Sequence, residues 1–219
     1  MAILFDDTFG DHPDGTFLGD YPIPKWENTP GLGYGLGLEH LRVDGGWVRP
    51  VYVSSPQGSV GSYYDYITPI GPPGWGEVTG VALEVKFDWS NETRGVQVVA
   101  RSGDTTTYLC SLNHQGVTGF RLYIGSNAYV IPPVTQGIAA ELRVEVAGSL
   151  VSVFVDDVLQ GTSLLAPFAG AVAIKIASDT PSPFTGDGLL SVGRISVYGA
   201  TPPEPSAFWT ALRDTSESV

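Results

Sequence analysis

The sequence is poor in cysteine, in positive charge and in long apolar runs. Its single cysteine, Cys110, excludes an internal disulfide, and no run approaches the roughly 18 apolar residues of a membrane span. Eleven Lys and Arg residues stand against 23 Asp and Glu residues, which gives a net charge of −12. Because binding to phosphates requires clustered positive charge, we expect no nucleic-acid partner. Because no apolar run is long enough, we expect no membrane insertion.

The two ends of the chain differ in sequence pattern from the part between them. The start, MAILFDD, lacks the basic segment and the long apolar run of a signal peptide, so we expect synthesis in a cytoplasm. Near the other end, TPPEP is typical of a stiff linker, and SAFWTALRDT is typical of one short amphipathic helix. We therefore predict a domain over residues 1–199, then a linker and docking helix over residues 200–219. The predicted partner-docking residues are Phe208, Trp209 and Leu212.

Short alternating segments dominate the rest of the chain. The 28 Gly and 17 Pro residues separate segments such as VTGVALEVKFDW and LRVEVAGSLVSVFV, in which apolar and polar residues alternate. Alternation predicts a strand with one buried face, and no segment before residue 200 has a sustained helical period. Many short, evenly spaced strands predict an all-β jelly-roll sandwich of two antiparallel sheets. Trp47 and Trp89 fall within the strand patterns and are expected in the core.

Two adjacent acids, Asp156 and Asp157, follow the second strand of the LRVEVAGSLVSVFV run. After them, Val158 and Leu159 run back as a further strand. A two-residue turn needs positive φ, which Asp tolerates better than most residues. We therefore interpret the acid pair as a turn, and the alternatives are a metal ligand or a catalytic acid.

The run LRVEVAGSLVSVFVDDVLQG, followed by GAVAIKIA and LLSVGRISVYG, resembles the concanavalin A-like, laminin G-like jelly-roll family. Members commonly carry a strand, a turn, a strand ending in Asp-Gly and a return strand. Here Asp157 stands where glycine is usual. The opening FDDTFGDHPDGTFLGD, with Trp26 after it, resembles the starts of such domains in tail-associated proteins of bacteriophages.

The resemblance implies a non-enzymatic structural subunit of a bacteriophage virion, either a tail-associated minor tail protein or a protein that decorates the particle. Its implied partners are other virion proteins, further copies of itself in a homo-oligomer, and host-surface polysaccharide. The alternative is a carbohydrate-binding module or a glycan hydrolase of the same fold.

Enzymatic motifs are scarce in the sequence. Glycoside hydrolysis needs two carboxylates flanking the scissile bond. In EVKFDWSNE, Glu84 and Asp88 are roughly 13 Å apart along one strand, more than the roughly 6.5–9.5 Å of an inverting enzyme. His12, His40 and His114 lack metal-site spacing, and no G-x-S-x-G motif occurs. We therefore expect no enzyme activity.

Two groups of residues remain as candidate binding sites. Aromatic side chains near SYYDYITPIGPPGWG could stack on a sugar, or they could pack in the core. Acidic residues near the N-terminus could bind calcium, or they could form turns on a solvated surface. Calcium is the cofactor that we expect if there is one. The candidate glycan-binding residues are Tyr64, Tyr66 and Trp75. The candidate calcium ligands are Asp6, Asp7 and Asp11.

Overall fold

The computed structural model describes twelve separate stretches of the chain: 2–20, 25–28, 38, 41–50, 63–69, 78–87, 93–102, 105–115, 119–125, 128–165, 171–179 and 190–200. Within them the helical structure is limited to 3-10 turns, at η1 (Leu18–Asp20) and at Leu38, and no helix is long and apolar enough to cross a membrane. The predicted all-β fold is confirmed. The predicted docking helix, with Phe208, Trp209 and Leu212, lies outside the described residues, as do Trp75 and Trp89.

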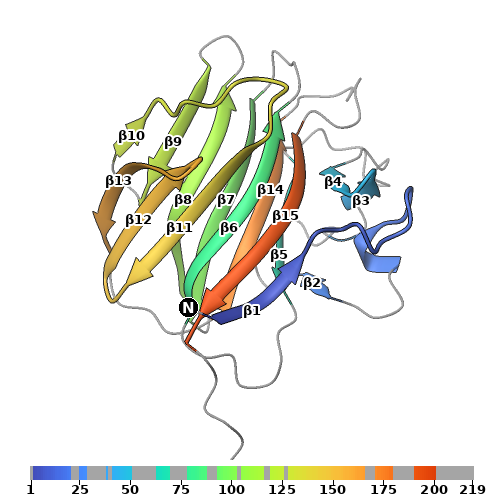
Figure 1. Cartoon of the computed structure of the whole chain (residues 1–219), viewed down its shortest axis with the longest axis horizontal. Helices are drawn as coiled ribbons and strands as arrows, with labels where there is room; N and C mark the ends of the chain where they lie inside the picture. The colour runs from blue at the N-terminus through green and yellow to red at the C-terminus, as the bar shows by residue number, and fades with distance from the viewer. Residues whose placement is uncertain are drawn as a thin grey trace, which may run out of the picture.

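Two antiparallel sheets lie face to face as the layers of a sandwich (Figure 1). In the described part of the chain, the first sheet has eight strands, and β1 (Ala2–Asp7) joins it by pairing with β15. The other strands, in spatial order, are β13 (Val158–Leu164), β12 (Leu150–Val155), β11 (Ala140–Ala147), β6 (Val78–Phe87), β15 (Leu190–Gly199), β4 (Trp47–Pro50) and β3 (Leu41–Asp44).

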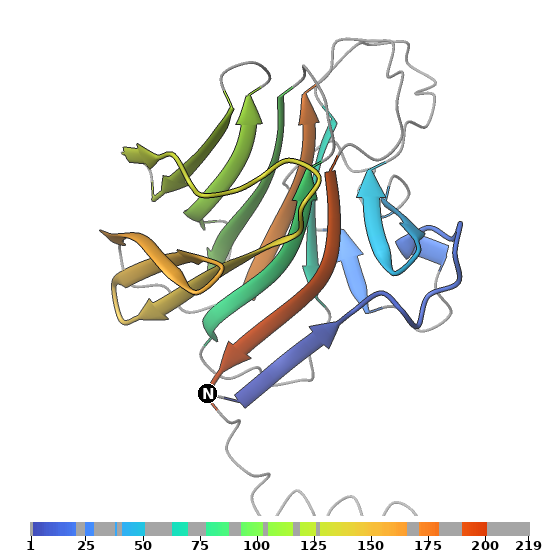
Figure 2. The ribbon, with the colours of Figure 1, turned by 45° about the horizontal axis from the view of Figure 1, so that its top comes forward.

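The second sheet has seven strands within the described residues, and Figure 2 shows it behind the first from a second direction. Strands that are neighbours in space are often distant in sequence, since β14 lies between β7 and β5. The spatial order is β10 (Ala128–Val130), β9 (Phe120–Ile124), β8 (Thr105–Gln115), β7 (Thr93–Ser102), β14 (Ala171–Asp179), β5 (Tyr63–Pro69) and β2 (Trp26–Asn28).

The core lies between the two sheets and follows the alternation of the sequence. On β6 the predicted inner residues are all buried, and Leu83 lies directly opposite the buried Leu142 of β11 and Ile195 of β15. Full burial of one such side chain contributes about 1.5–3 kcal/mol. The polar residues between them, such as Glu84, therefore lie on the outer face, where a ligand can reach them.

The turn between β12 and β13 is built by the acid pair, as the sequence predicts. Asp156 and Asp157 have φ values of 47° and 64°, in the left-handed region. The Asp156 carboxylate accepts a hydrogen bond from the Glu141 backbone N–H at 2.8 Å, and the Asp157 carboxylate forms an ion pair with Arg143 at 2.8 Å. Asp156 thus also fastens the turn to the neighbouring strand β11.

This difference between the two acids is testable. Asp157→Gly should leave the free energy of unfolding unchanged within about 0.5 kcal/mol, because glycine enters positive φ without strain and the lost ion pair is exposed. Asp156→Gly should cost about 1 kcal/mol, because the hydrogen bond to Glu141 is lost. Urea denaturation measures both. Equal losses for the two variants would contradict the separate role of Asp156.

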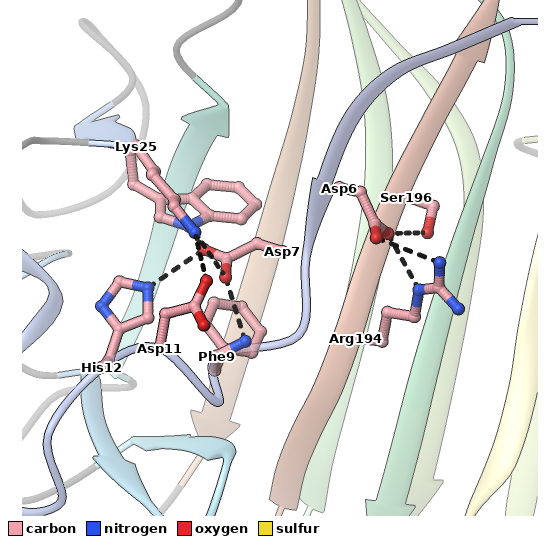
Figure 3. Close-up of polar contacts among 9 residues, drawn as sticks. Asp6, Asp7, Phe9, Asp11, His12, Lys25, Arg194 and Ser196 are labelled. Atoms are coloured by element: carbon pink, nitrogen blue, oxygen red, sulfur yellow. Dashed lines mark hydrogen bonds and ion pairs between the residues drawn. The ribbon is translucent and has the colours of Figure 1, made fainter.

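The N-terminal segment is held by a buried carboxylate, Asp7, whose residue is only 2% exposed. Its oxygens accept hydrogen bonds from the Trp26 indole at 2.8 Å and the Phe9 backbone N–H at 2.9 Å (Figure 3). The ring of His12 lies 3.3 Å away and the Lys25 ammonium 3.5 Å away. Because Trp26 belongs to β2 and Asp7 to β1, this carboxylate joins the edges of the two sheets.

Loss of this carboxylate should destabilise the sandwich. Asp7→Ala leaves the buried indole and amide donors unsatisfied, so we expect a loss of about 3 kcal/mol in unfolding free energy. Asp11→Ala is the matched control, because Asp11 pairs with the same Lys25 at 3.5 Å but its side chain is 77% exposed. The control should change stability by less than about 0.5 kcal/mol. A similar effect of both substitutions in urea titrations would contradict the role of Asp7.

Candidate functional site

Strand register lines up polar and aromatic residues in rows across the seven-stranded sheet. Directly opposite residues in antiparallel strands share a face, so each row is a line across that face. One row follows β5, β14, β7, β8, β9 and β10 and consists of Tyr66, Lys175, Gln97, Ser111, Tyr123 and Tyr129. The next row consists of Tyr64, Ala177, Gly95, Asn113 and Arg121.

A shallow pocket of about 310 Å³ opens on this face, beside the row that ends at Tyr129. We call the pocket, this row and the neighbouring Arg121 the tyrosine groove. The rim is aromatic, since Tyr108 is 47% exposed and Tyr129, next to the pocket, is 51% exposed. The side chain of Asn113 lies over Gly95, where an added Cβ would overlap its oxygen. The lining residues are Gln97, Tyr108, Cys110, Ser111, Asn113, Tyr123 and Gly125.

The groove side chains hold one another in place. The Ser111 hydroxyl donates to the Asn113 side-chain oxygen at 3.0 Å, which leaves the Asn113 amide nitrogen as a donor. The rings of Tyr123 and Tyr129 are 5.6 Å apart, and the Arg121 guanidinium lies 4.8 Å from the centre of the Tyr129 ring. The groove therefore combines flat apolar surfaces with fixed hydrogen-bonding groups.

Cys110 lines the groove but does not supply a nucleophile. Burial raises the pKa of its thiol to about 12, so the group is a neutral thiol at neutral pH. The residue is buried in the way expected of a small hydrophobe, and it belongs to the same core cluster as Leu112. Chemistry in this groove therefore depends on its oxygen and nitrogen atoms.

The sequence-based candidates lie at the β5 end of this face, and the residues at its β8–β9 end were not predicted. Tyr64 and Tyr66 occupy the β5 ends of the two rows, while Trp75 lies outside the described residues. The residues missed are Tyr108, Tyr123 and Arg121. A signal for them was present, because TTTYLCSLN and FRLYIG place tyrosine at the positions that alternate with buried leucines. Only the register, however, shows that the two groups of tyrosines share rows.

A second pocket, of about 330 Å³, lies on the outer face of the eight-stranded sheet, and we call it the acidic pocket. Glu84 of β6 lies directly opposite Glu141 of β11 in the register. Directly opposite residues have Cβ atoms about 4.5–5.5 Å apart, and both glutamates line this pocket. The other lining residues are Ala82, Leu83, Ala139, Ala140, Asp156, Arg194, Ser196 and Tyr198.

An aromatic ring lies beside this pocket because of a glycine. A Cβ added at Gly193 would lie 2.8 Å from the Glu84 carboxylate and 2.9 Å from the Trp47 ring. Glycine thus lets both side chains approach the strand closely. Trp47, which the sequence placed in the core, is only half-buried and lies on this outer face, while Trp26 is the tryptophan of the described core.

The three candidate calcium ligands do not converge. Asp6 forms two hydrogen bonds with Arg194 at 2.8 and 3.0 Å, whereas Asp7 turns into the core and Asp11 is exposed (Figure 3). In the described residues no three His, Cys, Asp or Glu side chains form a group that could hold a metal ion. The calcium expectation therefore gains no support from this part of the chain.

The Asp6 ion pair should make stability depend on acidity. Hydrogen bonds from Arg194 hold the pKa of Asp6 below its ordinary value. A lowered folded-state pKa gives stability that is present above the unfolded pKa of about 3.9 and is lost as the pH falls through the folded pKa. The difference in melting temperature between the wild type and Asp6→Asn should therefore shrink between pH 6 and pH 2. A constant difference would contradict this assignment.

The two antiparallel sheets form a jelly-roll β-sandwich, and each sheet has a pocket on its outer face. No protein-family model and no curated protein matches the sequence. Solved structures do match. A β-agarase A in complex with oligoagarose has a TM-score of 0.64 at 12% identity, covering 90% of this chain and 92% of that chain.

Two further structures agree with this comparison. SCLam, a non-specific endo-β-1,3(4)-glucanase from family GH16, has a TM-score of 0.61 at 11% identity and covers 91% of both chains. An endo-acting O-glycanase of the human gut microbiota has a TM-score of 0.61 at 12% identity, covering 91% of this chain and 100% of that chain. At such identities the comparison establishes the jelly-roll fold.

These findings correct the expectation of a phage virion subunit. The similar structures are glycan-active proteins, which favours the alternative expectation, a carbohydrate-binding module or glycan hydrolase. The opening segment that suggested a phage protein has a structural explanation. Asp7, Phe9 and Trp26 form a buried cluster that fastens the sandwich. Packing of the sandwich therefore accounts for these three residues of the opening pattern.

The expectation that the protein is not an enzyme is also corrected. Its similar structures include a β-agarase, an endo-glucanase and an O-glycanase. The expectation was drawn from acids along one strand, where Glu84 and Asp88 are too far apart. Register across strands was not considered, and it places Glu141 directly opposite Glu84. A carboxylate pair can therefore form between strands that are distant in the sequence.

Proposed function

We propose that the protein binds a glycan in the tyrosine groove. The observation that carries this proposal is the row of register positions from Tyr66 to Tyr129, with Gln97, Ser111 and Tyr123 between them. A sugar ring has an apolar C–H face and an edge of hydroxyl groups. Tyrosine rings suit the first, and side-chain amides and hydroxyls suit the second.

The shape of the groove favours an extended ligand. Five strand intervals separate β5 from β10, and strands lie about 4.8 Å apart, so the row is about 24 Å long. The pocket occupies only the part near β8 and β9, beside the half-exposed Tyr108. A chain of several sugars can therefore lie across the strands, with one sugar seated in the pocket.

A single substitution should remove this binding. Tyr123→Ala deletes the ring between Ser111 and Tyr129, and we expect affinity for the bound oligosaccharide to fall at least tenfold, which corresponds to about 1.4 kcal/mol. Tyr198→Ala, on the outer face of the eight-stranded sheet, is the matched control and should keep wild-type affinity. Isothermal titration calorimetry measures both. Loss of binding in Tyr198→Ala alone would move the glycan to the acidic pocket.

Glycoside hydrolysis is a second candidate function, and the pair Glu84 and Glu141 is the observation that favours it. A retaining glycosidase has carboxyl groups about 5–5.5 Å apart. Directly opposite strand positions have Cβ atoms about 4.5–5.5 Å apart, so rotation of the two side chains can bring their carboxyl groups to that separation. One carboxylic acid would protonate the glycosidic oxygen while the other carboxylate bonds to the anomeric carbon. Water would then release the sugar and return the proton to the first group.

Release of new reducing ends from polysaccharides tests hydrolysis. Glu84→Gln and Glu141→Gln should each lower the rate at least about a hundredfold, because each removes a group that transfers a proton or attacks carbon. Glu145→Gln is the matched control, since Glu145 lies on the same strand and face and, like Glu141, pairs with Arg143, but it does not line the acidic pocket. A rate that survives both substitutions would exclude this pair as the catalytic one.

A further inference from the structure

Arg121, the arginine of the tyrosine groove, differs from four other cations that the structure describes. Lys25, Arg49, Arg143 and Arg194 each form an ion pair with at least one carboxylate. Arg121 instead stacks on Tyr129 at 4.8 Å, and among the residues that the structure describes no carboxylate pairs with it. In a chain with 23 acids and 11 bases, an arginine that pairs with none of the described acids needs an explanation.

The position of Arg121 supplies one. It lies directly opposite Asn113, which lines the groove, so its side chain is on the groove face. The Tyr129 ring covers one flat side of the guanidinium and fixes its orientation, while the N–H groups at its edge can still donate. A guanidinium held in this way fits a planar carboxylate or a sulfate oxygen pair.

The charge around the groove also favours a negatively charged ligand. None of the described residues that line the pocket is Asp or Glu, although the whole chain carries a net charge of −12. The register position opposite Gln97 in the same row is occupied by a second basic residue, Lys175. The pocket is thus lined without described acids on an otherwise acidic protein, while the described acids of this face, Glu27 of β2 and Asp179 of β14, lie outside its lining. Such local charge directs where an anion can bind.

We infer that the tyrosine groove binds an acidic glycan, with a carboxylate or sulfate-ester group of one sugar paired to Arg121. This inference rests on the proposed glycan-binding function and adds the chemical class of the ligand. Tyr123 and Tyr129 would contact the sugar rings, Asn113 would donate to a hydroxyl, and Arg121 would select for the negative charge. A neutral glycan of the same length would leave the guanidinium without a partner.

Binding of three short oligosaccharides of equal length tests the inference by calorimetry. The probes are an oligogalacturonate, a sulfated carrageenan oligosaccharide and a neutral agaro-oligosaccharide. We expect at least one acidic probe to bind at least tenfold more tightly than the neutral one, and the tighter acidic probe identifies the anionic group. Affinity for it should fall when NaCl is raised from 50 to 500 mM, because salt screens charge pairs.

The variants assign the effect to one side chain. Arg121→Gln should lose at least about tenfold in affinity for the acidic probe and should not change affinity for the neutral probe. Arg121→Lys should recover part of the loss, since it restores charge without the planar geometry. Arg49→Gln, which removes a cation paired with Asp44 on the other sheet, is the matched control and should bind normally.

The contrary outcomes separate this inference from the proposed function. Equal affinity for neutral and acidic probes, unchanged in Arg121→Gln, would overturn the acidic-ligand inference and leave glycan binding intact. If no probe bound to the wild-type protein and a wider set of neutral glycans also failed, both would be overturned. Circular dichroism and melting curves show whether a variant has folded. If Arg121→Gln does not fold, the affinities of Arg121→Lys for the acidic and neutral probes are compared instead.

Discussion

Antiparallel register across the seven-stranded sheet is the constraint on which the tyrosine groove depends. Each strand fixes its neighbour, so Tyr66 and Tyr129, which are far apart in the sequence, come to lie in one row. A shift of one residue in any of these pairings would turn every side chain of the shifted strand to the opposite face. Burial of Val96, Leu112 and Ile174 on the inner face opposes such a shift.

The two sheets give the protein two different outer faces. The seven-stranded sheet presents tyrosines, amides and one arginine without a described carboxylate partner, whereas the eight-stranded sheet presents Glu84, Glu141 and the half-buried Trp47. The core between them keeps the faces independent, because alternate residues of each strand are buried. Binding and hydrolysis therefore have separate candidate sites, and each can be altered without changing the other.

Sequence patterns predicted the features that depend on local chemistry. The alternation around Leu83 predicted the buried face of β6, and the Asp156-Asp157 pair predicted a turn with positive φ. Features that depend on pairing between distant strands were missed, because no local pattern records register. The convergence of Glu84 with Glu141 is one example. Asp6 and Asp7 show the opposite case, in which residues adjacent in the sequence are separated in space. They lie on opposite faces of β1, because successive side chains of a strand point to opposite faces.

The most direct test of glycan binding in the tyrosine groove is a titration of isotope-labelled protein with oligosaccharide, read by backbone amide chemical shifts. If the glycan binds in the tyrosine groove, the amide shifts that change should lie together on the outer face of the seven-stranded sheet, at Gln97, Ser111, Asn113, Tyr123 and Tyr129. The amide shifts around Glu84 and Glu141 should stay fixed at ligand concentrations that saturate the groove. Shift changes confined to the eight-stranded sheet, with none in the groove, would contradict the account.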